Sequence, residues 1–114
     1  MQYDGFERRI VFCIWFGKNP MPVNRAAALL SILNNINCPV QLLHDDNYRN
    51  WILPEHPFHP AFELLTDTHK SDYLRAYLMY HFGGGYTDLK FTFNDWSSKF
   101  VELGNSDKYC LGYR

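Results

Sequence analysis

Hydrophobic positions along the chain fall into runs of two kinds, separated by glycine, proline and asparagine. Residues 10–16 (IVFCIWF) are continuously apolar and are followed by Gly17 and Pro20, which is typical of a strand buried on both faces of a parallel sheet. Residues 39–44 (PVQLLH) form a shorter run that leads into two aspartates and an asparagine, a pattern that predicts a second strand ending in a turn.

Helical periodicity separates these two strands. Residues 22–35 are rich in alanine and leucine, which favours a helix lying on the first strand. The apolar residues at helical spacing, which we expect to face that strand, are Ala26, Leu29, Leu30 and Leu33. A strand, a helix and a strand within this length predict a right-handed βαβ unit.

A second helix is predicted over residues 67–82, after a proline-rich loop at 51–60. We expect Thr66 or Asp67 to cap its start and Gly83 to supply the left-handed residue at its end. The expected buried face is Leu74, Tyr77, Leu78, His81 and Phe82.

Residues 86–93 (YTDLKFTF) alternate in the manner of a third strand, which would place Tyr86, Asp88, Lys90 and Thr92 on one side. A short helix is expected around Trp96, Phe100 and Val101. The predicted fold class is therefore α/β, a mostly parallel sheet flanked by helices, and the 114 residues are expected to form a single domain, residues 1–114.

Composition and charge narrow the classes of partner. Eleven basic and twelve acidic residues are intermixed, with a net charge of −1, so no broad positive field is available for a nucleic acid. No apolar run is long enough to span a membrane. The three cysteines are widely spaced, without a CxxC pair, and are expected to be reduced thiols of a cytoplasmic protein.

Residues 69–92 carry the candidate chemistry. Asp72 and Arg75 stand three residues apart on the second helix, so their side chains emerge on the same face; a solvated ion pair is the plainer interpretation of that spacing. The glycine turn at 83–85 delivers the chain into a strand that holds Asp88 near the edge where open α/β sheets place their ligand sites.

In this order, the residues resemble the glycosyltransferases with a DXD-containing sugar-binding region, a family that includes capsular polysaccharide synthesis proteins. Its signature is matched by Ser71-Asp72-Tyr73-Leu74-Arg75, the apolar helix, the glycines 83–85, Tyr86, Thr87 and Asp88-Leu89-Lys90. The family often begins with a strand ending in tryptophan and glycine, which Ile14-Trp15-Phe16-Gly17 matches. The resemblance spans about residues 10–92 and implies a Rossmann-like nucleotide-diphosphosugar transferase fold of the GT-A type.

Carried over residue by residue, the resemblance implies a donor site. Trp15 would lie against the nucleotide base, with Phe16 and Gly17 shaping that wall, although a buried position in the core is the alternative for Trp15. Asp72 and Arg75 would bind hydroxyls of the donor sugar, and the glycine turn with Gly84, Gly85 and Tyr86 would border the substrate. Asp88 would bind ribose or sugar hydroxyls and help to position a divalent cation, Mn²⁺ or Mg²⁺.

Lys90 departs from the family pattern because it occupies the position of the second aspartate. A protonated lysine has three donors and no acceptor, so it cannot coordinate a metal ion. Two accounts remain open: the ammonium itself neutralises the diphosphate, or Asp88 recruits a cation together with another carboxylate. Asp88 and Lys90 are accordingly the candidate catalytic residues, and the metal dependence is left undecided.

The resemblance implies transfer of a hexose from a nucleotide-diphosphate sugar, a UDP-sugar above all, to a glycan or other hydroxyl acceptor, with retention of anomeric configuration. Family members carry further strands and acceptor-binding helices after the DXD strand, whereas only residues 94–114 follow here. Relative to that family, the sequence is thus expected to be truncated at its C-terminus. It would then be a fragment, a minimal version of the transferase, or a chain that is incomplete as an enzyme. The alternative is a catalytically silent sugar-nucleotide-binding module, or a subunit that a partner completes; a flavodoxin-like domain is a weaker third, because no phosphate loop follows the first strand.

Other polar residues invite a functional interpretation. The five histidines are scattered along the chain, and a metal site made from them is not expected. Asp45 and Asp46 follow the second strand and could reach ribose hydroxyls, but a solvated turn is the preferred interpretation of that pair. Tyr73, Tyr77 and Tyr80 are expected to pack rather than to bind an acceptor.

Overall fold

A βαβ unit opens the fold. The structure, a computed structural model, describes residues 9–104. Strand β1 (Val11–Trp15) is followed by helix α1 (Val23–Asn35) and strand β2 (Val40–His44), and the two strands pair in parallel from Val11 opposite Val40 to Trp15 opposite His44. The strand–helix–strand prediction is confirmed for these residues.

A third strand completes the sheet on the other side of β1. Strand β3 (Gly85–Tyr86) pairs in parallel with β1, with Val11 opposite Gly85 and Phe12 opposite Tyr86. The strand order is β2-β1-β3, so the central strand is the most apolar one. Between β2 and β3 lie two short 3-10 helices, η1 (Tyr48–Trp51) and η2 (Pro60–Leu64), and helix α2 (Asp67–His81); helix α3 (Ser97–Gly104) follows β3. The chain therefore has a small, open, parallel α/β sheet, an arrangement compatible with a Rossmann-like fold.

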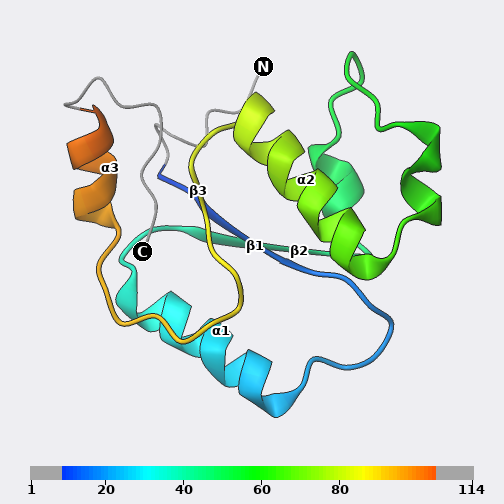
Figure 1. Cartoon of the computed structure of the whole chain (residues 1–114). Coiled ribbons are helices and arrows are strands. Elements are labelled where there is room, and N and C mark those ends of the chain that lie inside the picture. Colours follow the sequence, from blue (N-terminus) through cyan, green and yellow to red (C-terminus); the bar gives the residue numbers. More distant parts are fainter. Residues whose placement is uncertain (1–8, 105–114) are drawn as a thin grey trace.

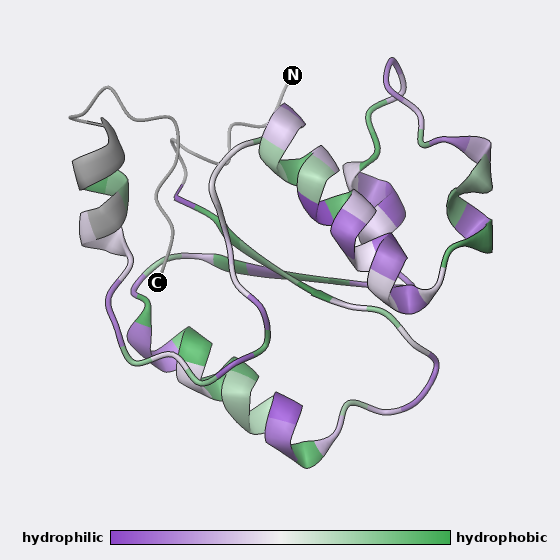
Figure 2. Cartoon of the chain, viewed as in Figure 1, coloured by the Kyte–Doolittle hydropathy of each residue, from purple (hydrophilic) through white to green (hydrophobic). Residues whose placement is uncertain are grey.

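The two faces of β1 belong to two separate hydrophobic clusters. Phe12, Ile14 and Phe16 pack with residues of α2, while Val11 and Cys13 pack with residues of α1 and α3. Figure 1 shows α1 and α2 on opposite sides of the sheet, and in Figure 2 the hydrophobic colour runs along much of β1 between them. Both faces of the central strand are thus covered, as its unbroken apolar run requires.

Helix α1 is rotated from the orientation expected from its leucines. Ala28 and Ile32 are the buried residues of the helix, whereas Leu30 and Leu33 are 59% and 52% exposed, so the predicted buried face was wrong for these two leucines. Ala28 is buried, and Ile32 and the following Ile36 pack in the hydrophobic cluster that contains Val11.

Helix α2 agrees closely with its prediction. Thr66 caps the helix, since its Oγ1 accepts a hydrogen bond from the backbone N–H of His69 at 3.3 Å. Gly83 has a φ of 70° just beyond the C-terminus, which is the left-handed conformation that favours glycine. Of the expected buried face, Leu74, Tyr77, Leu78 and Phe82 are buried and His81 is half-buried.

The predicted third strand over residues 86–93 was wrong beyond its first residue. The chain leaves the sheet after Thr87, whose N–H still donates to the Phe12 carbonyl at 3.0 Å. Side chains of α1 then bind the departing backbone: the Arg25 guanidinium donates to the Leu89 carbonyl and the Asn35 amide to the Thr92 carbonyl, both at 2.8 Å. Figure 1 shows this segment crossing to the side of α1 before α3 begins.

The expected alternation after β3 fails for the same reason. Leu89 is buried, but Phe91 and Phe93, predicted to share its side of a strand, are 58% and 76% exposed. The short helix expected near Phe100 is present as α3, with Phe100 buried and Trp96 partly buried against the α1 side of the sheet. Within residues 9–104, no helix has the length and apolar character needed to cross a membrane.

Candidate functional site

The candidate site lies at the carboxyl ends of the parallel strands. β1 ends at Trp15, β2 at His44 and β3 at Tyr86, and parallel strands bring their carboxyl ends to the same edge of a sheet. In open α/β sheets this edge is where ligands bind. Gly17 follows the end of β1 by two residues and Asp88 follows the end of β3 by two residues, and β3 ends opposite Phe12, three residues before the end of β1.

Arg75 joins helix α2 to strand β3. Its guanidinium lies 3.5 Å from the Asp72 carboxylate, one helical turn earlier, and its Cζ lies 5.5 Å from the centre of the Tyr86 ring. The guanidinium is therefore held between a carboxylate and an aromatic face, two contacts that fix its orientation. The i,i+3 ion pair that the spacing predicts is present, and it is directed at β3.

Tyr86 carries the connection to Asp88. The phenol hydroxyl donates a hydrogen bond to Asp88 Oδ1 at 3.1 Å, and the Lys90 ammonium lies 3.9 Å from Asp88 Oδ2. Five predicted site residues thus form one connected group, which we call the polar cluster: Asp72, Arg75, Tyr86, Asp88 and Lys90.

The charged members of the polar cluster are open to solvent. Exposed fractions of the side chains are 58% for Asp72, 47% for Arg75, 56% for Asp88 and 75% for Lys90. A ligand can reach two carboxylates that accept hydrogen bonds and two cationic groups that donate them. Such a set of alternating charges suits a ligand that carries both hydroxyl groups and anionic oxygens.

Burial and the Asp88 charge act on two neighbouring acids. Desolvation, followed by the Asp88 charge and by the hydrogen bond to Asp88, raises the pKa of Tyr86 far above its usual range. Burial, and then the same carboxylate, raises the pKa of the Cys13 thiol to about 12. Both groups are therefore protonated at neutral pH, and Tyr86 remains a hydrogen-bond donor to Asp88.

The predicted nucleotide wall is divided between the two faces of the sheet. Trp15 is half-buried and packs against the hydrophobic cluster on the α1 face of β1, while Arg75 belongs to α2 on the opposite face. Phe16 is buried on the α2 face, where its ring contacts Tyr48 at 5.3 Å edge to face. Phe16 thus contributes to the core, and Trp15 and the polar cluster can share a ligand only across the edge of the sheet.

Two aspartates converge on Gly17. The Gly17 N–H donates to Asp45 Oδ2 at 3.1 Å, and Asp67 Oδ2 lies 3.7 Å from the position that a Cβ on Gly17 would take. Gly17 has a φ of 138°, where a side chain would be strained. The turn predicted at Asp45 and Asp46 is confirmed, and Asp46 is exposed, while Asp45 is half-buried and bonded to Gly17. Nothing in the local sequence brings Asp67 to Gly17.

The glycines before β3 have backbone and packing roles. Gly84 has a φ of 91°, which glycine adopts without strain. A Cβ on Gly85 would lie 3.3 Å from Val11 Cγ2 and 3.4 Å from the rings of Trp96 and Phe100. Close packing between β3, β1 and α3 therefore accounts for glycine at position 85.

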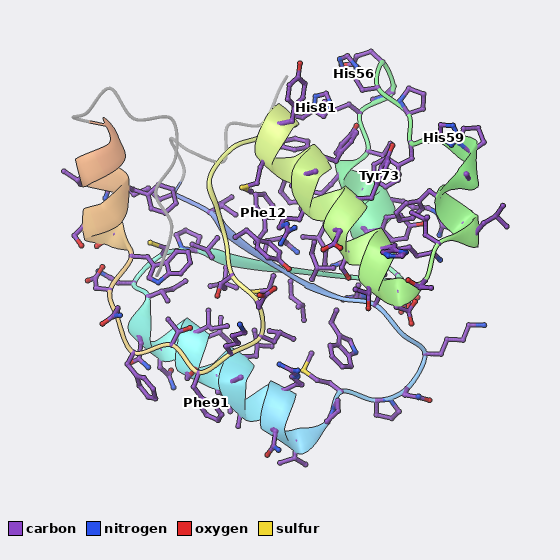
Figure 3. The ribbon with its side chains drawn as sticks, in the orientation of Figure 1. Phe12, His56, His59, Tyr73, His81 and Phe91 are labelled. Carbon is purple, nitrogen blue, oxygen red and sulfur yellow. The ribbon has the colours of Figure 1, made fainter. Side chains whose placement is uncertain are left out.

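The donor set around Asp88 does not resemble a metal site. The group next to its Oδ2 is the Lys90 ammonium, a cation that repels a second cation. In the described part of the chain, no three histidine, cysteine, aspartate or glutamate side chains gather as ligands. The rings of His56 and His81 do lie against each other, with their centres 4.6 Å apart, and Figure 3 shows the two residues together at the C-terminal end of α2.

A second cluster has nearly the same make-up as the polar cluster. Arg49 lies 3.5 Å from Glu63, its Cζ lies 5.0 Å from the Tyr48 ring, and the Tyr48 hydroxyl donates to Glu63 at 3.1 Å. These residues belong to η1 and η2, and η1 begins four residues after the end of β2. The pair of clusters offers an internal control, because both combine an arginine, a carboxylate and a tyrosine.

Comparison of the chain with protein-family models, with curated proteins and with solved structures gives no match.

Proposed function

We propose that the polar cluster binds the diphosphate and sugar of a nucleotide-diphosphate sugar, and that the chain is the donor-binding domain of a glycosyltransferase of the GT-A type. The observation that carries the proposal is the contact of Arg75 with Tyr86 at 5.5 Å. It joins the Asp72–Arg75 pair of α2 to the Asp88–Lys90 pair after β3 at the edge where parallel sheets bind ligands.

Each charged group has a task that its chemistry permits. Asp72 and Asp88 accept hydrogen bonds from sugar or ribose hydroxyls, and the Arg75 guanidinium donates to hydroxyl or phosphate oxygens. The Lys90 ammonium lies beside Asp88 and is 75% exposed, so it is placed to neutralise the charge of a diphosphate. We assign this task to Lys90 in preference to a divalent cation, because an ammonium replaces the second carboxylate of the motif.

The transfer itself needs little from the protein beyond positioning and charge. The bond between the anomeric carbon and the diphosphate oxygen breaks, and the diphosphate leaves with the electron pair. A bond forms from the anomeric carbon to the acceptor oxygen, whose proton is released to solvent. Lys90 and Arg75 stabilise the charge that develops on the leaving oxygen. The anomeric configuration is expected to be retained, as the resemblance implies.

The test is a calorimetric and turnover assay with UDP-glucose, UDP-galactose and GDP-mannose. We expect binding of at least one donor, slow release of its nucleoside diphosphate, and binding that is about tenfold to a hundredfold weaker in Asp88→Ala, the usual effect of removing a hydrogen bond to a charged group. Glu55→Ala removes an exposed carboxylate from the proline-rich loop and should change neither quantity. No binding of any donor to the natural chain would refute the proposal.

The same assay separates the two accounts of Lys90. If the ammonium neutralises the diphosphate, binding to the natural chain should survive a chelator, and Lys90→Asp should bind the donor only when Mn²⁺ is added. Metal-dependent binding by the natural chain would assign that task to a cation instead.

The second candidate is a sugar-nucleotide-binding module without transferase activity. Within the polar cluster, both carboxylates already have partners, since Asp72 is paired with Arg75 and Asp88 with Tyr86 and Lys90. Neither carboxylate of the cluster is thus free to act as a base for the acceptor, which favours this candidate. Tight donor binding without any release of nucleoside diphosphate would select this candidate.

A further inference from the structure

Two exposed phenylalanines follow Lys90 directly. Phe91 and Phe93 are 58% and 76% exposed, and their rings are nearly parallel, with an angle of 13° between the planes and 6.5 Å between the centres. Aromatic pairs in a core most often meet edge to face or in closer offset stacks. These two rings therefore present open aromatic surface to solvent rather than completing a buried cluster.

The backbone between the two rings is fixed to helix α1. The N–H of Thr92 donates to Ser31 Oγ at 3.0 Å, and the carbonyl of Thr92 accepts from the Asn35 amide at 2.8 Å. Ser31 in turn donates to the Ala28 carbonyl at 2.7 Å. Both polar groups of the central residue are satisfied by one rigid helix, so the two phenyl rings stand on a fixed base, and Figure 3 shows Phe91 beside α1.

Exposed aromatic surface of this kind fits a sugar ring. One face of a pyranose is a flat array of C–H groups, which the electron-rich face of a phenyl ring attracts, while the hydroxyls project around its rim. In the sequence, Lys90 precedes the two phenylalanines and Asn94 follows them, and both residues are exposed. The side chains of both residues offer hydrogen-bond donors for those hydroxyls, and Asn94 also offers an acceptor. A purely apolar partner would leave these polar neighbours unused.

We propose that Phe91 and Phe93 form the acceptor platform: a stacking surface for a pyranose ring of a glycan acceptor. The proposal rests on the proposed function, because the platform is useful only beside a donor site. Lys90 precedes Phe91 directly, and three residues span at most ~11 Å of extended chain. The backbone of the platform therefore lies within that distance of the residue that is proposed to neutralise the diphosphate.

The experiment measures binding of disaccharides to the whole chain by NMR. Lactose, cellobiose and maltose are titrated, and the ring signals of the phenylalanines are followed together with the affinity for UDP-glucose. The double variant Phe91→Leu/Phe93→Leu keeps apolar side chains but removes the aromatic faces, and it should weaken disaccharide binding by at least about tenfold without changing the UDP-glucose affinity. Tyr80→Leu removes another aromatic side chain, 85% exposed on α2, and should change neither.

The possible outcomes separate the platform from the donor site. If UDP-glucose binds but no disaccharide does, or if the double variant binds disaccharides like the natural chain, the platform is refuted and the donor site stands. If disaccharides bind through Phe91 and Phe93 but no sugar nucleotide binds, the platform stands as a carbohydrate site and the proposed function fails. Self-association of the natural chain that the double variant abolishes, without disaccharide binding, would show that the rings form an interface between copies and would refute the platform.

Discussion

At the scale of single residues, Arg75 and Arg49 differ in position far more than in environment. Each lies 3.5 Å from a carboxylate and about the same distance from a tyrosine ring, 5.5 Å for Arg75 and 5.0 Å for Arg49. Exposed ion pairs of this kind stabilise a fold by about 1 kcal/mol at most, so their contribution to stability does not distinguish the two arginines. What distinguishes Arg75 is its place beside the strand that leads to Asp88 and Lys90.

Cys13 gives a pH dependence that can be worked out from its burial. Burial raises the pKa of this thiol to about 12, above the value of about 8.5 expected in an unfolded chain. Below pH 8.5 the thiol is protonated in both states and contributes no pH dependence. As the pH rises further, the unfolded chain loses the proton first, so the free energy of unfolding falls with a slope approaching ~1.4 kcal/mol per pH unit.

Urea unfolding at pH 8, 9 and 10 measures this slope. Cys13→Ala should flatten it, even though the cavity it leaves lowers stability at every pH. Cys38, which is only partly buried, serves as the comparison, and Cys38→Ala should retain most of the slope. An unchanged slope in Cys13→Ala would show that the thiol is not shielded as the structure indicates.

At the scale of elements, local patterns predicted the helices and the first two strands, while contacts between distant residues decided the rest. The extents of α1 and α2, the Thr66 cap and the turn at Gly83 all depend on neighbours in sequence. Strand β3 does not: residues 89–92 leave the sheet because Arg25, Ser31 and Asn35, some 60 residues earlier, bind their backbone. An alternating pattern carries no information about such a competitor for its hydrogen bonds.

The candidate site shows the same division. The ion pair of Asp72 and Arg75 follows from helical spacing alone, and Asp88 is a candidate site residue because of its place in the motif. The face of the sheet on which Trp15 lies was not predictable from the sequence. Alternation along a strand shows only that Trp15 and Phe16 point to opposite faces, and the tertiary fold decides which helix covers each face.

The attachment of residues 89–92 to α1 leads to a prediction at this scale. Ser31→Ala removes the acceptor of the Thr92 N–H, so hydrogen exchange at Thr92 should become about fivefold faster, as expected for the loss of about 1 kcal/mol of local stability. Asn34→Ala, an exposed position of the same helix, should leave the exchange rate unchanged. Equal protection of Thr92 in both variants would contradict the role of α1 in directing this segment.

At the scale of the whole molecule, the polar cluster joins α2, β3 and the segment that follows β3. Lys90 belongs to this cluster and directly precedes the acceptor platform, whose backbone is bound to α1. The aromatic cluster around Phe16, Tyr48 and Phe62 packs on the α2 face of the sheet. The central claim is that the polar cluster, and not the similar cluster around Arg49, is the ligand site.

An NMR titration of the isotopically labelled chain with UDP-glucose, following the backbone amide signals of the whole molecule, tests that claim directly. The predicted result is that the largest shifts fall on Arg75, Tyr86, Asp88 and Lys90, while the amides of Arg49 and Glu63 hardly move. Shifts centred on Arg49 and Glu63, or no shifts at saturating UDP-glucose, would contradict the account.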